Sequence, residues 1–414
     1  MPNKDKNIPK RRFKAFENAD AWELRKLGEV ATFAKGKGYS KQDLVADGSP
    51  IILYGRLYTK YETIISEIDT FISVNETRNA VLSEGGEVLV PASGESPADI
   101  ARASVVTKKG IILGGDLNII RLNSKISPIF LALTISNREP QKELSKRAQG
   151  KSVVHLHNSD LKEVEFVTPT LPEQSAIGTF FSTLDRHITL HQRKLDKLKS
   201  EKQAYLSEMF PAEGERVPKR RFSGFTDDWE LRKLNNIADV RDGTHNSPRY
   251  IEFGYPLVTS KNIKNGQVNF EDIQYISSFD YEEINKRSKV NINDILMGMI
   301  GTVGNLALVR EEPEFAIKNV ALIKNIGVVN IEFLYHYLGS YVIERQLQNS
   351  LDGGTQKFIS LNKIRHLDIA FPSLPEQKAI GTFFSTLDRQ ITLHQRKLEK
   401  LKNLKKALLN ELFV

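Results

Sequence analysis

Residues 171–199 read LPEQSAIGTFFSTLDRHITLHQRKLDKLK, and residues 374–402 read LPEQKAIGTFFSTLDRQITLHQRKLEKLK. The two stretches lie at an offset of 203 residues, and the positions at which they differ are Ser175/Lys378, His187/Gln390 and Asp196/Glu399. A match of this length at a fixed offset indicates an internal duplication. Such a repeat decides how the rest of the chain is interpreted.

A second pair of matches marks the start of each half. The motif PKRRF occupies residues 9–13 and 218–222, and WELRKL occupies residues 22–27 and 229–234. Between these motifs and the long repeats the two halves diverge sharply. The chain therefore has constant ends and variable middles in each half.

The constant repeats predict two long helices. Pro172 and Pro375 suit a first helical position, and the glutamates that follow them suit the positive first turn. Apolar residues then recur with alternating spacings of four and three, which is the pattern of a heptad seam. The residues predicted to pair along this seam are Ile177, Phe181, Leu184, Ile188, Leu195, Leu198, Ile380, Phe384, Leu387, Ile391, Leu398 and Leu401.

Each predicted helix has about 40 residues and would be about 60 Å long at 1.5 Å per residue. We expect the two helices to pair within one chain in antiparallel fashion, with the variable heads at opposite ends; the alternative is that they dimerise the protein. Lys202 and Lys405, like His191 and His394, fall on seam positions, where polar residues fix the register. The aspartates before Arg186 and Arg389, Asp185 and Asp388, are most simply interpreted as solvated charges.

The expected fold class is α+β, with two mixed α/β heads separated by an antiparallel coiled coil and related by a pseudo-two-fold repeat. Short apolar runs bounded by turn residues, such as Glu87–Val90 and Asp294–Met297, predict strands in both heads. The predicted segments are a basic N-terminal segment (1–19), a first head (20–170), a first long helix (171–216), a second head (217–373) and a second long helix (374–414).

Composition indicates a globular chain in a reducing compartment. The 414 residues include no cysteine, which excludes disulfides and thiolate metal sites. The formal net charge of +8 suits a polyanionic partner but is a weak sign by itself. The longest apolar run is too short for a membrane span, and the N-terminus has no signal-peptide core, so we expect a cytoplasmic protein.

Several motifs then point to a family. Residues 168–174 read TPTLPEQ and residues 371–377 read FPSLPEQ, and the second head contains DGTH at 242–245, GTVG at 301–304 and GGTQ at 353–356. With these motifs, and with the order of head, boundary motif and long helix given twice, the chain resembles the specificity (S) subunit of type I restriction–modification systems. The resemblance covers nearly the whole chain, and the doubled boundary motif is highly specific.

The resemblance implies that each head reads one half of an asymmetric, interrupted site in double-stranded DNA. The helices would set the gap between the half-sites and dock two methyltransferase (M) subunits, which restriction (R) subunits join. S-adenosylmethionine, ATP and magnesium would belong to those partners, with no cofactor and no metal in this chain. Unlike heads agree with unlike half-sites, and a repeated frame offers two equivalent docking surfaces.

Basic, aromatic and turn-rich stretches are the candidate DNA contacts, because base edges and phosphates are read by such side chains. A solvated loop is the alternative for each stretch. The basic run 389–406 could face DNA phosphates, an acidic partner surface or water. The individual candidates are Lys35, Lys37, Tyr39, Lys41, Arg56, Tyr58, Lys60, Lys151, Arg241, His245, Asn246, Arg249, Tyr250, Lys261, Asn262, Lys264, Gln356 and Lys357.

The apparent catalytic motifs each fail against their own internal copy. The Gly150-Lys-Ser sequence lacks the earlier glycine of a phosphate loop. The zinc-like pair His187 and His191 is lost in the second helix, where Gln390 replaces His187, and the nuclease-like Glu376-x-Lys spacing is lost in the first. We therefore expect a non-catalytic subunit. The rivals are a complete restriction or modification enzyme and a coiled-coil adaptor without a DNA role.

Overall fold

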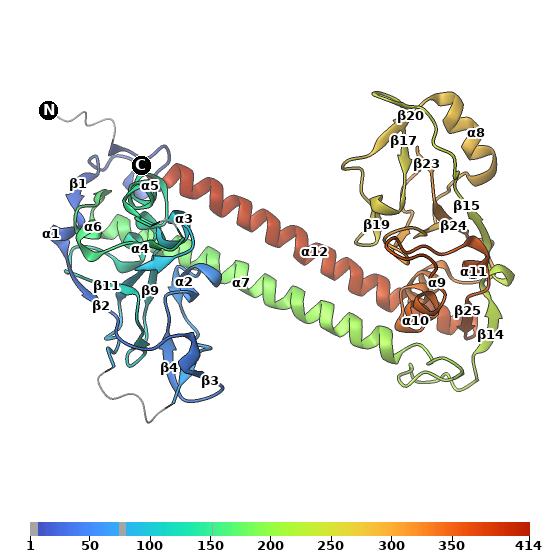
Figure 1. Cartoon of the computed structure of the whole chain (residues 1–414), viewed down its shortest axis with the longest axis horizontal. Coiled ribbons are helices and arrows are strands. Elements are labelled where there is room, and N and C mark those ends of the chain that lie inside the picture. Colours follow the sequence, from blue (N-terminus) through green and yellow to red (C-terminus); the bar gives the residue numbers. More distant parts are fainter. Residues whose placement is uncertain (1–6, 74–79, 151) are drawn as a thin grey trace. The chain divides into compact units, whose positions relative to one another are not determined.

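The computed structural model describes residues 7–73, 80–150 and 152–414. Contacts divide the chain into unit 1, residues 1–191 with 396–414, and unit 2, residues 192–395. The divisions fall inside the two long helices α7 (Leu171–Glu208) and α12 (Leu374–Leu412), so each unit holds one head and one part of each helix (Figure 1). Among the described residues, no helix combines the length and apolar character of a membrane span.

The head of unit 1 is a mixed α/β fold. Its largest sheet has the order β2-β11-β7-β9-β5, and a second has the order β10-β4-β6-β3. Two short pairs, β1-β13 and β12-β8, complete it. Its strands are β1 (Glu23–Lys26), β2 (Ala31–Lys35), β3 (Leu44–Val45), β4 (Ser49–Ile52), β5 (Ile64–Ile65), β6 (Phe71–Ile72), β7 (Glu87–Pro91), β8 (Ser93–Gly94), β9 (Ser104–Val106), β10 (Ile112–Leu113), β11 (Leu117–Leu122), β12 (Val154–His155) and β13 (Glu165–Thr168); its helices are α1 (Leu27–Val30), α2 (Arg56–Thr59), α3 (Pro97–Ile100), α4 (Pro128–Ile135), α5 (Arg138–Arg147) and α6 (Asn158–Lys162).

The head of unit 2 has two four-stranded sheets, β15-β24-β21-β22 and β16-β20-β17-β23, with the pairs β14-β25 and β18-β19. Its strands are β14 (Glu230–Lys233), β15 (Asp239–Asp242), β16 (Tyr250–Ile251), β17 (Tyr255–Val258), β18 (Ile263–Lys264), β19 (Gln267–Val268), β20 (Gln274–Ile276), β21 (Ile295–Gly298), β22 (Leu306–Leu308), β23 (Ala316–Ile317), β24 (Val320–Lys324) and β25 (Asp368–Phe371); its helices are α8 (Ser278–Ser288), α9 (Ile331–Leu338), α10 (Tyr341–Asn349) and α11 (Leu361–Arg365).

The two heads share a frame despite their divergent sequences. The antiparallel pair β1-β13 recurs as β14-β25, and the antiparallel set β2-β11-β7 recurs as β15-β24-β21. Helices α4, α5 and α6 recur as α9, α10 and α11 in the same order. The predicted mixed α/β heads and internal repeat are therefore confirmed, and the repeat extends through the variable regions as well.

The predicted antiparallel helix pairing is confirmed within each unit. In unit 1, Phe181 near the start of α7 shares a core with Leu408 near the end of α12. In unit 2 the ring of Phe210, just after α7, stacks on that of Phe384 near the start of α12, with centroids 5.7 Å apart. The predicted seam residues are buried, except Ile188, which is partly buried against the unit 1 core.

A glycine in each long helix lets a head helix approach closely. A Cβ atom at Gly381 would lie 2.9 Å from the backbone nitrogen of Phe333 at the start of α9. At the equivalent Gly178 it would lie 3.4 Å from the Ile129 side chain, which is close to an ordinary van der Waals contact. The helical penalty of glycine is thus offset by packing of the head on the frame.

Candidate DNA interface and its frame

Buried ion pairs join the constant segments in both units. Arg12 of the first PKRRF motif forms a bidentate pair with Glu173, at 2.8 and 2.7 Å, and only 7% and 1% of the two side chains are exposed. Arg221 of the second motif pairs with Glu376 in the same way, at 2.6 and 2.8 Å. In each pair the hydrogen bond to glutamate is the main cause that raises the pKa of the arginine. The basic motifs therefore fix the frame and are not free DNA-binding tails.

The glutamine of each LPEQ motif ties the helix start to its head. The Gln377 side chain accepts a hydrogen bond from the Asn330 backbone nitrogen at 2.9 Å and donates to the Pro372 carbonyl at 2.8 Å. Gln174 does the same with Ser127 and Pro169, at 2.8 and 2.9 Å. The boundary motif thus supplies identical attachments for two unlike heads.

The interpretation of Asp185 and Asp388 as solvated charges is wrong. Lys405 lies 2.6 Å from Asp185 in unit 1, and Lys202 lies 2.5 Å from Asp388 in unit 2. All four side chains are mostly buried, with exposures between 19% and 33%. Each seam lysine is therefore matched by an aspartate of the opposite helix, which strengthens the argument that polar seam residues fix the register.

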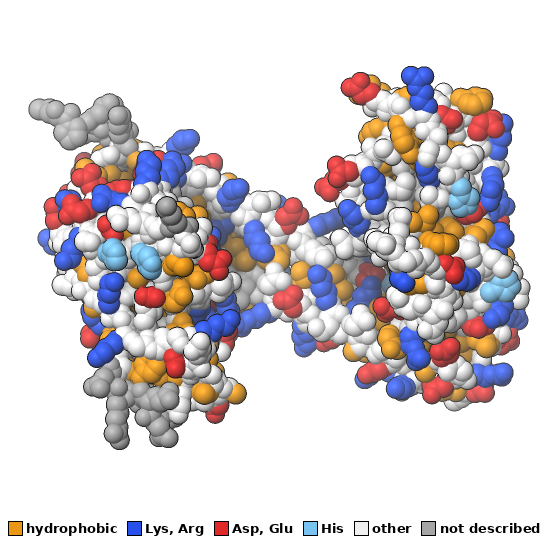
Figure 2. Space-filling model, viewed as in Figure 1, with side chains coloured by type: hydrophobic (Ala, Val, Ile, Leu, Met, Phe, Trp, Pro, Cys, Tyr) orange, Lys and Arg blue, Asp and Glu red, His pale blue; other side chains and the backbone are white. Residues whose placement is uncertain are grey.

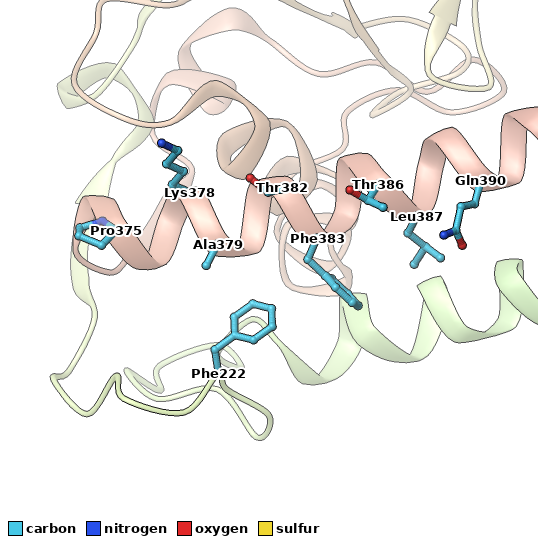
Figure 3. Close-up of a pocket in the computed structure, with 9 residues that line it drawn as sticks. All are labelled: Phe222, Pro375, Lys378, Ala379, Thr382, Phe383, Thr386, Leu387 and Gln390. Carbon is cyan, nitrogen blue, oxygen red and sulfur yellow. The ribbon is translucent and has the colours of Figure 1, made fainter.

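A groove lies along the first turns of α12 in unit 2 (Figure 3). The ring of Phe222 faces α12 and meets Phe383 edge to face at 5.9 Å, as Phe13 meets Phe180 at 5.5 Å in unit 1. The groove has a volume of about 620 Å³. It is lined by Phe222, Pro375, Lys378, Ala379, Thr382, Phe383, Thr386, Leu387 and Gln390, so it consists of constant residues apart from Lys378 and Gln390.

The DGTH motif of the second head lies at a cavity of about 540 Å³, to which it contributes Asp242 and His245. The DGTH motif begins at the last residue of β15, and its Gly243 is required because a Cβ would lie 2.1 Å from the Ile317 carbonyl oxygen. The GTVG and GGTQ turns are joined by the hydrogen bond from the Gly301 nitrogen to the Lys357 carbonyl, at 2.9 Å. The cavity is lined by Asp242, His245, Met299, Ile300, Asn319, Phe358, Ile359, Ser360, Leu361, Asn362 and Arg365.

His245 is held at the rim of this cavity by two acceptors. Its Nδ1 lies 2.8 Å from Asn319 Oδ1, and its Nε2 lies 2.8 Å from Asp242 Oδ2. The hydrogen bond with Asn319, followed by that with Asp242, raises the pKa of His245 above its ordinary value of 6.5. Asp242 is itself buried and also paired with Arg287. The loop therefore presents an imidazole with 59% of its side chain exposed and with both ring nitrogens held by neighbouring oxygen atoms.

Most of the predicted DNA contacts lie on the surface. In unit 1, Tyr39 and Tyr58 are half-buried, and burial raises the pKa of Tyr58. Lys151 lies outside the described residues. The exposed candidates are Lys35, Lys37, Lys41, Lys60, Arg241, His245, Asn246, Arg249, Tyr250, Lys261, Lys264, Gln356 and Lys357.

Two predicted contacts are corrected by the structure. Arg56 has 6% of its side chain exposed, and its guanidinium is bound by Glu62, at 2.7 Å, and by Asp69. Asn262 is 2% exposed and accepts a hydrogen bond from the Thr259 nitrogen at 3.0 Å. Both side chains organise loops from inside, so neither faces a DNA surface.

Sequence patterns missed Lys318 and Asn319, which come from the β23–β24 turn and meet the DGTH loop. Lys318 Nζ donates to Ser247 Oγ at 2.5 Å and lies 3.4 Å from the Tyr250 hydroxyl. Asn319 has a φ of 53°, which asparagine tolerates better than most residues. The one available signal was the polar Lys-Asn pair between two apolar strands.

On the face shown in Figure 2, basic side chains are mixed with acidic ones over each unit, as the modest net charge predicts. Among the described residues, no group of three or more His, Asp or Glu is placed to hold a metal ion. The candidate DNA interface therefore consists of loops, turns and basic side chains on a duplicated frame.

The comparisons with known proteins agree. Residues 19–200 and 226–403 match the model of the type I restriction modification DNA specificity domain, so the chain belongs to this family. It is similar to the type I restriction enzyme MjaVIII specificity subunit of Methanocaldococcus jannaschii, with 22% identity over 402 residues covering 94% of this chain and 91% of that protein. It is also similar to the EcoBI specificity subunit of Escherichia coli, with 25% identity over 297 residues covering 63% and 60%.

The fold is that of solved S subunits. The crystal structure of the S subunit from the type I restriction-modification system of M. genitalium aligns with a TM-score of 0.65 and 16% identity, covering 98% of this chain and 99% of that one. The prediction of a DNA specificity subunit, in place of an enzyme with its own catalytic site, is confirmed by the family.

Proposed function

We propose that the two heads read the two unlike halves of an interrupted, asymmetric DNA site. The observation that carries this proposal is the duplicated frame: identical ion pairs and glutamine contacts hold two heads whose surface loops differ. Because the frame is repeated and the loops are not, each head offers its own pattern of donors and acceptors. Direct readout of different bases follows from such differences.

In the second head we assign base and phosphate contacts to the rim of the cavity around His245, together with Arg249, Tyr250 and Lys261. In the first head we assign them to the exposed lysines around residues 35–41 and to Lys60. The exposure of these side chains and the raised pKa of His245, caused by its hydrogen bonds with Asn319 and Asp242, support this assignment. Phosphate contacts would position each head, and base contacts would specify its half-site.

We further propose that the constant frame docks two methyltransferase subunits and sets the spacer between half-sites. The groove beside Phe222 and the equivalent ring pair in unit 1 support this proposal, since one partner could use the same kind of surface twice. S-adenosylmethionine, ATP and magnesium would be bound by methyltransferase and restriction subunits in the cytoplasm. The chain itself would contribute recognition only.

The test is to co-express the chain with candidate methyltransferase subunits and map methylated adenines across the genome. An interrupted, asymmetric motif is expected, and replacing residues 20–170 with a head from a related subunit should change one half of it. Methylation or cleavage by the chain alone would contradict the proposal. A motif that changes in both halves after one replacement would contradict the assignment of one half-site to each head.

A further inference from the structure

A basic cleft lies in unit 1 between the start of α5 and the last turns of α12. Its volume is about 570 Å³. Among the described residues that line it, five are Lys or Arg and none is Asp or Glu. The lining residues are Asn137, Arg138, Gln141, Lys142, Lys402, Lys405, Lys406, Leu409 and Asn410.

Neighbouring acids neutralise only part of this charge. Lys405 is paired with Asp185 at 2.6 Å, and Lys142 is paired with Glu139 at 2.7 Å. Lys402 and Lys406 are exposed and stand one helical turn apart on α12. The Arg138 guanidinium lies 3.4 Å from a carbonyl oxygen, that of Phe413, which leaves its charge in place. The cleft therefore keeps an excess of positive charge.

The backbone at Arg138 is also unusual. Its φ of 59° lies in the left-handed region, which a long side chain rarely adopts. The equivalent residue of unit 2, Tyr341, is not among the described residues with positive φ. Conformations of this kind persist where the surrounding structure imposes them, and they are enriched at functional sites.

Part of the charge of the cleft is specific to unit 1, whereas Lys402 and Lys405 have lysine counterparts in the repeat. At an offset of 203 residues, Arg138, Gln141 and Lys406 correspond to Tyr341, Glu344 and Gln203, so the matching surface of unit 2 has two fewer positive charges and one more negative charge. A partner that docks twice on the duplicated frame would meet unequal surfaces at these positions. The cleft therefore fits a polyanion that binds the first half of the chain at this position. The second half does not offer the same charge for such a contact.

Two chains of contacts link the cleft to the segment that follows Tyr58 and Lys60 in the first head. Arg102 lies over the ring of Tyr61, 5.5 Å from its centroid, and the next residue, Ala103, is hydrogen-bonded to Ser136 at 2.8 Å. Ser136 comes two residues before Arg138. On another path, Thr63 donates to Asp185, the partner of Lys405. The basic cleft and the candidate recognition loop thus belong to one connected region of unit 1.

We propose that this cleft binds backbone phosphates of the DNA duplex whose half-site the first head reads. The inference rests on the DNA-reading role proposed above and adds to it a sequence-independent anchor that is more strongly basic in unit 1 than the matching surface of unit 2. Arg138 offers a planar guanidinium, and Lys402 and Lys406 offer mobile ammonium groups; all are suited to phosphate oxygens. Such contacts release counterions and make binding steeply dependent on salt without specifying bases.

The test gives unit 1 the residues of unit 2, in the variant R138Y/Q141E/K406Q, which removes two positive charges, adds one negative charge and so lowers the net charge by three. Its control, K108Q/K109E, removes the same charge from an exposed turn of the same head. Affinity for a 50-bp duplex is measured over a series of salt concentrations, using the full chain purified with its methyltransferase subunits. We expect the variant to bind about tenfold more weakly, with the slope of log affinity against log salt reduced by about 2, at about 0.9 per phosphate contact.

The control should keep the wild-type slope of log affinity against log salt concentration. The methylated DNA motif should stay unchanged in both variants. Equal slopes for the variant and the control would overturn the proposal. So would loss of a partner subunit with DNA affinity unchanged, which would assign the cleft to an acidic protein surface. If the triple variant does not fold, K402Q/K406Q gives the same test at two exposed side chains. A wild-type complex that binds no DNA would refute the proposed function itself, not only this site.

Discussion

The variant Glu173→Gln tests whether the buried ion pairs hold each head on the frame. Glu173 is 1% exposed and accepts two hydrogen bonds from Arg12, so the amide would leave the guanidinium buried without its counter-charge. Removing one partner of a buried pair costs about 3–5 kcal/mol. The lower end applies here, because Arg12 also donates to the carbonyls of Ala19 and Asp20, at 2.6 and 3.0 Å.

A loss of about 3 kcal/mol in a unit of this size lowers the unfolding midpoint by roughly 6–12 °C, at about 2–4 °C per kcal/mol. Thermal unfolding followed by circular dichroism measures this shift. Hydrogen exchange then locates it, and we expect faster exchange of the amides of residues 7–30, which the ion pair ties to the start of α7. Glu376→Gln should produce the corresponding loss around residues 216–237 in unit 2.

The matched control is Glu163→Gln, which breaks an exposed pair with Lys26 and should leave the midpoint almost unchanged. The double variant R12M/E173L should recover much of the lost stability, because well-packed apolar residues often replace a buried ion pair without penalty. The reasoning is refuted if Glu173→Gln and Glu163→Gln unfold at the same temperature.

Three further predictions concern the loop, the seam and the helix contact. The hydrogen bonds at both ring nitrogens raise the pKa of His245, so this residue should titrate above 6.5 by NMR. Its contribution to stability is fully present below about 6.5 and is lost as the pH rises through the pKa of His245 in the folded protein. DNA affinity should fall over the same pH interval. Lys405→Asp should destabilise unit 1 by roughly 1 kcal/mol, and the exchange D185K/K405D should recover part of that loss in a double-mutant cycle, whereas additive effects would argue against the pair. Gly381→Ala should cost about 1–3 kcal/mol in thermal unfolding and Gly178→Ala less, because the added Cβ is more crowded at the first site; the reverse order would contradict the packing argument.

The sequence predicted the frame because its signals are local and periodic. The heptad seam gave both long helices and their pairing, and the apolar runs at Glu87–Val90 and Asp294–Met297 correspond to β7 and β21. Side-chain partners were predicted less well. Nothing near Asp185 in the sequence indicates that Lys405 will face it, since that contact depends on the register between two helices.

The candidate DNA contacts show the same limit. Arg56 and Lys60 are similar in sequence context, yet the first is buried by two carboxylates and the second is exposed. Composition of a loop predicts that it is polar, but burial depends on which distant residues fold against it. The cavity around His245 likewise is lined by segments that are far apart in the sequence, at residues 242–245, 299–300, 319 and 358–365.

The placement of charge explains how one frame can carry changing heads. Paired charges with little exposure, such as Arg12 with Glu173, lie between constant segments, where their geometry contributes to stability. Most of the charged groups that we assign to DNA lie on exposed loops, where substitutions usually change stability by less than about 0.5 kcal/mol. Target specificity can therefore change by substitution in these loops without loosening the attachment of the head. The exceptions are supporting residues such as Asp242, whose buried carboxylate orients His245, so a change there would alter both the fold of the loop and the surface it presents.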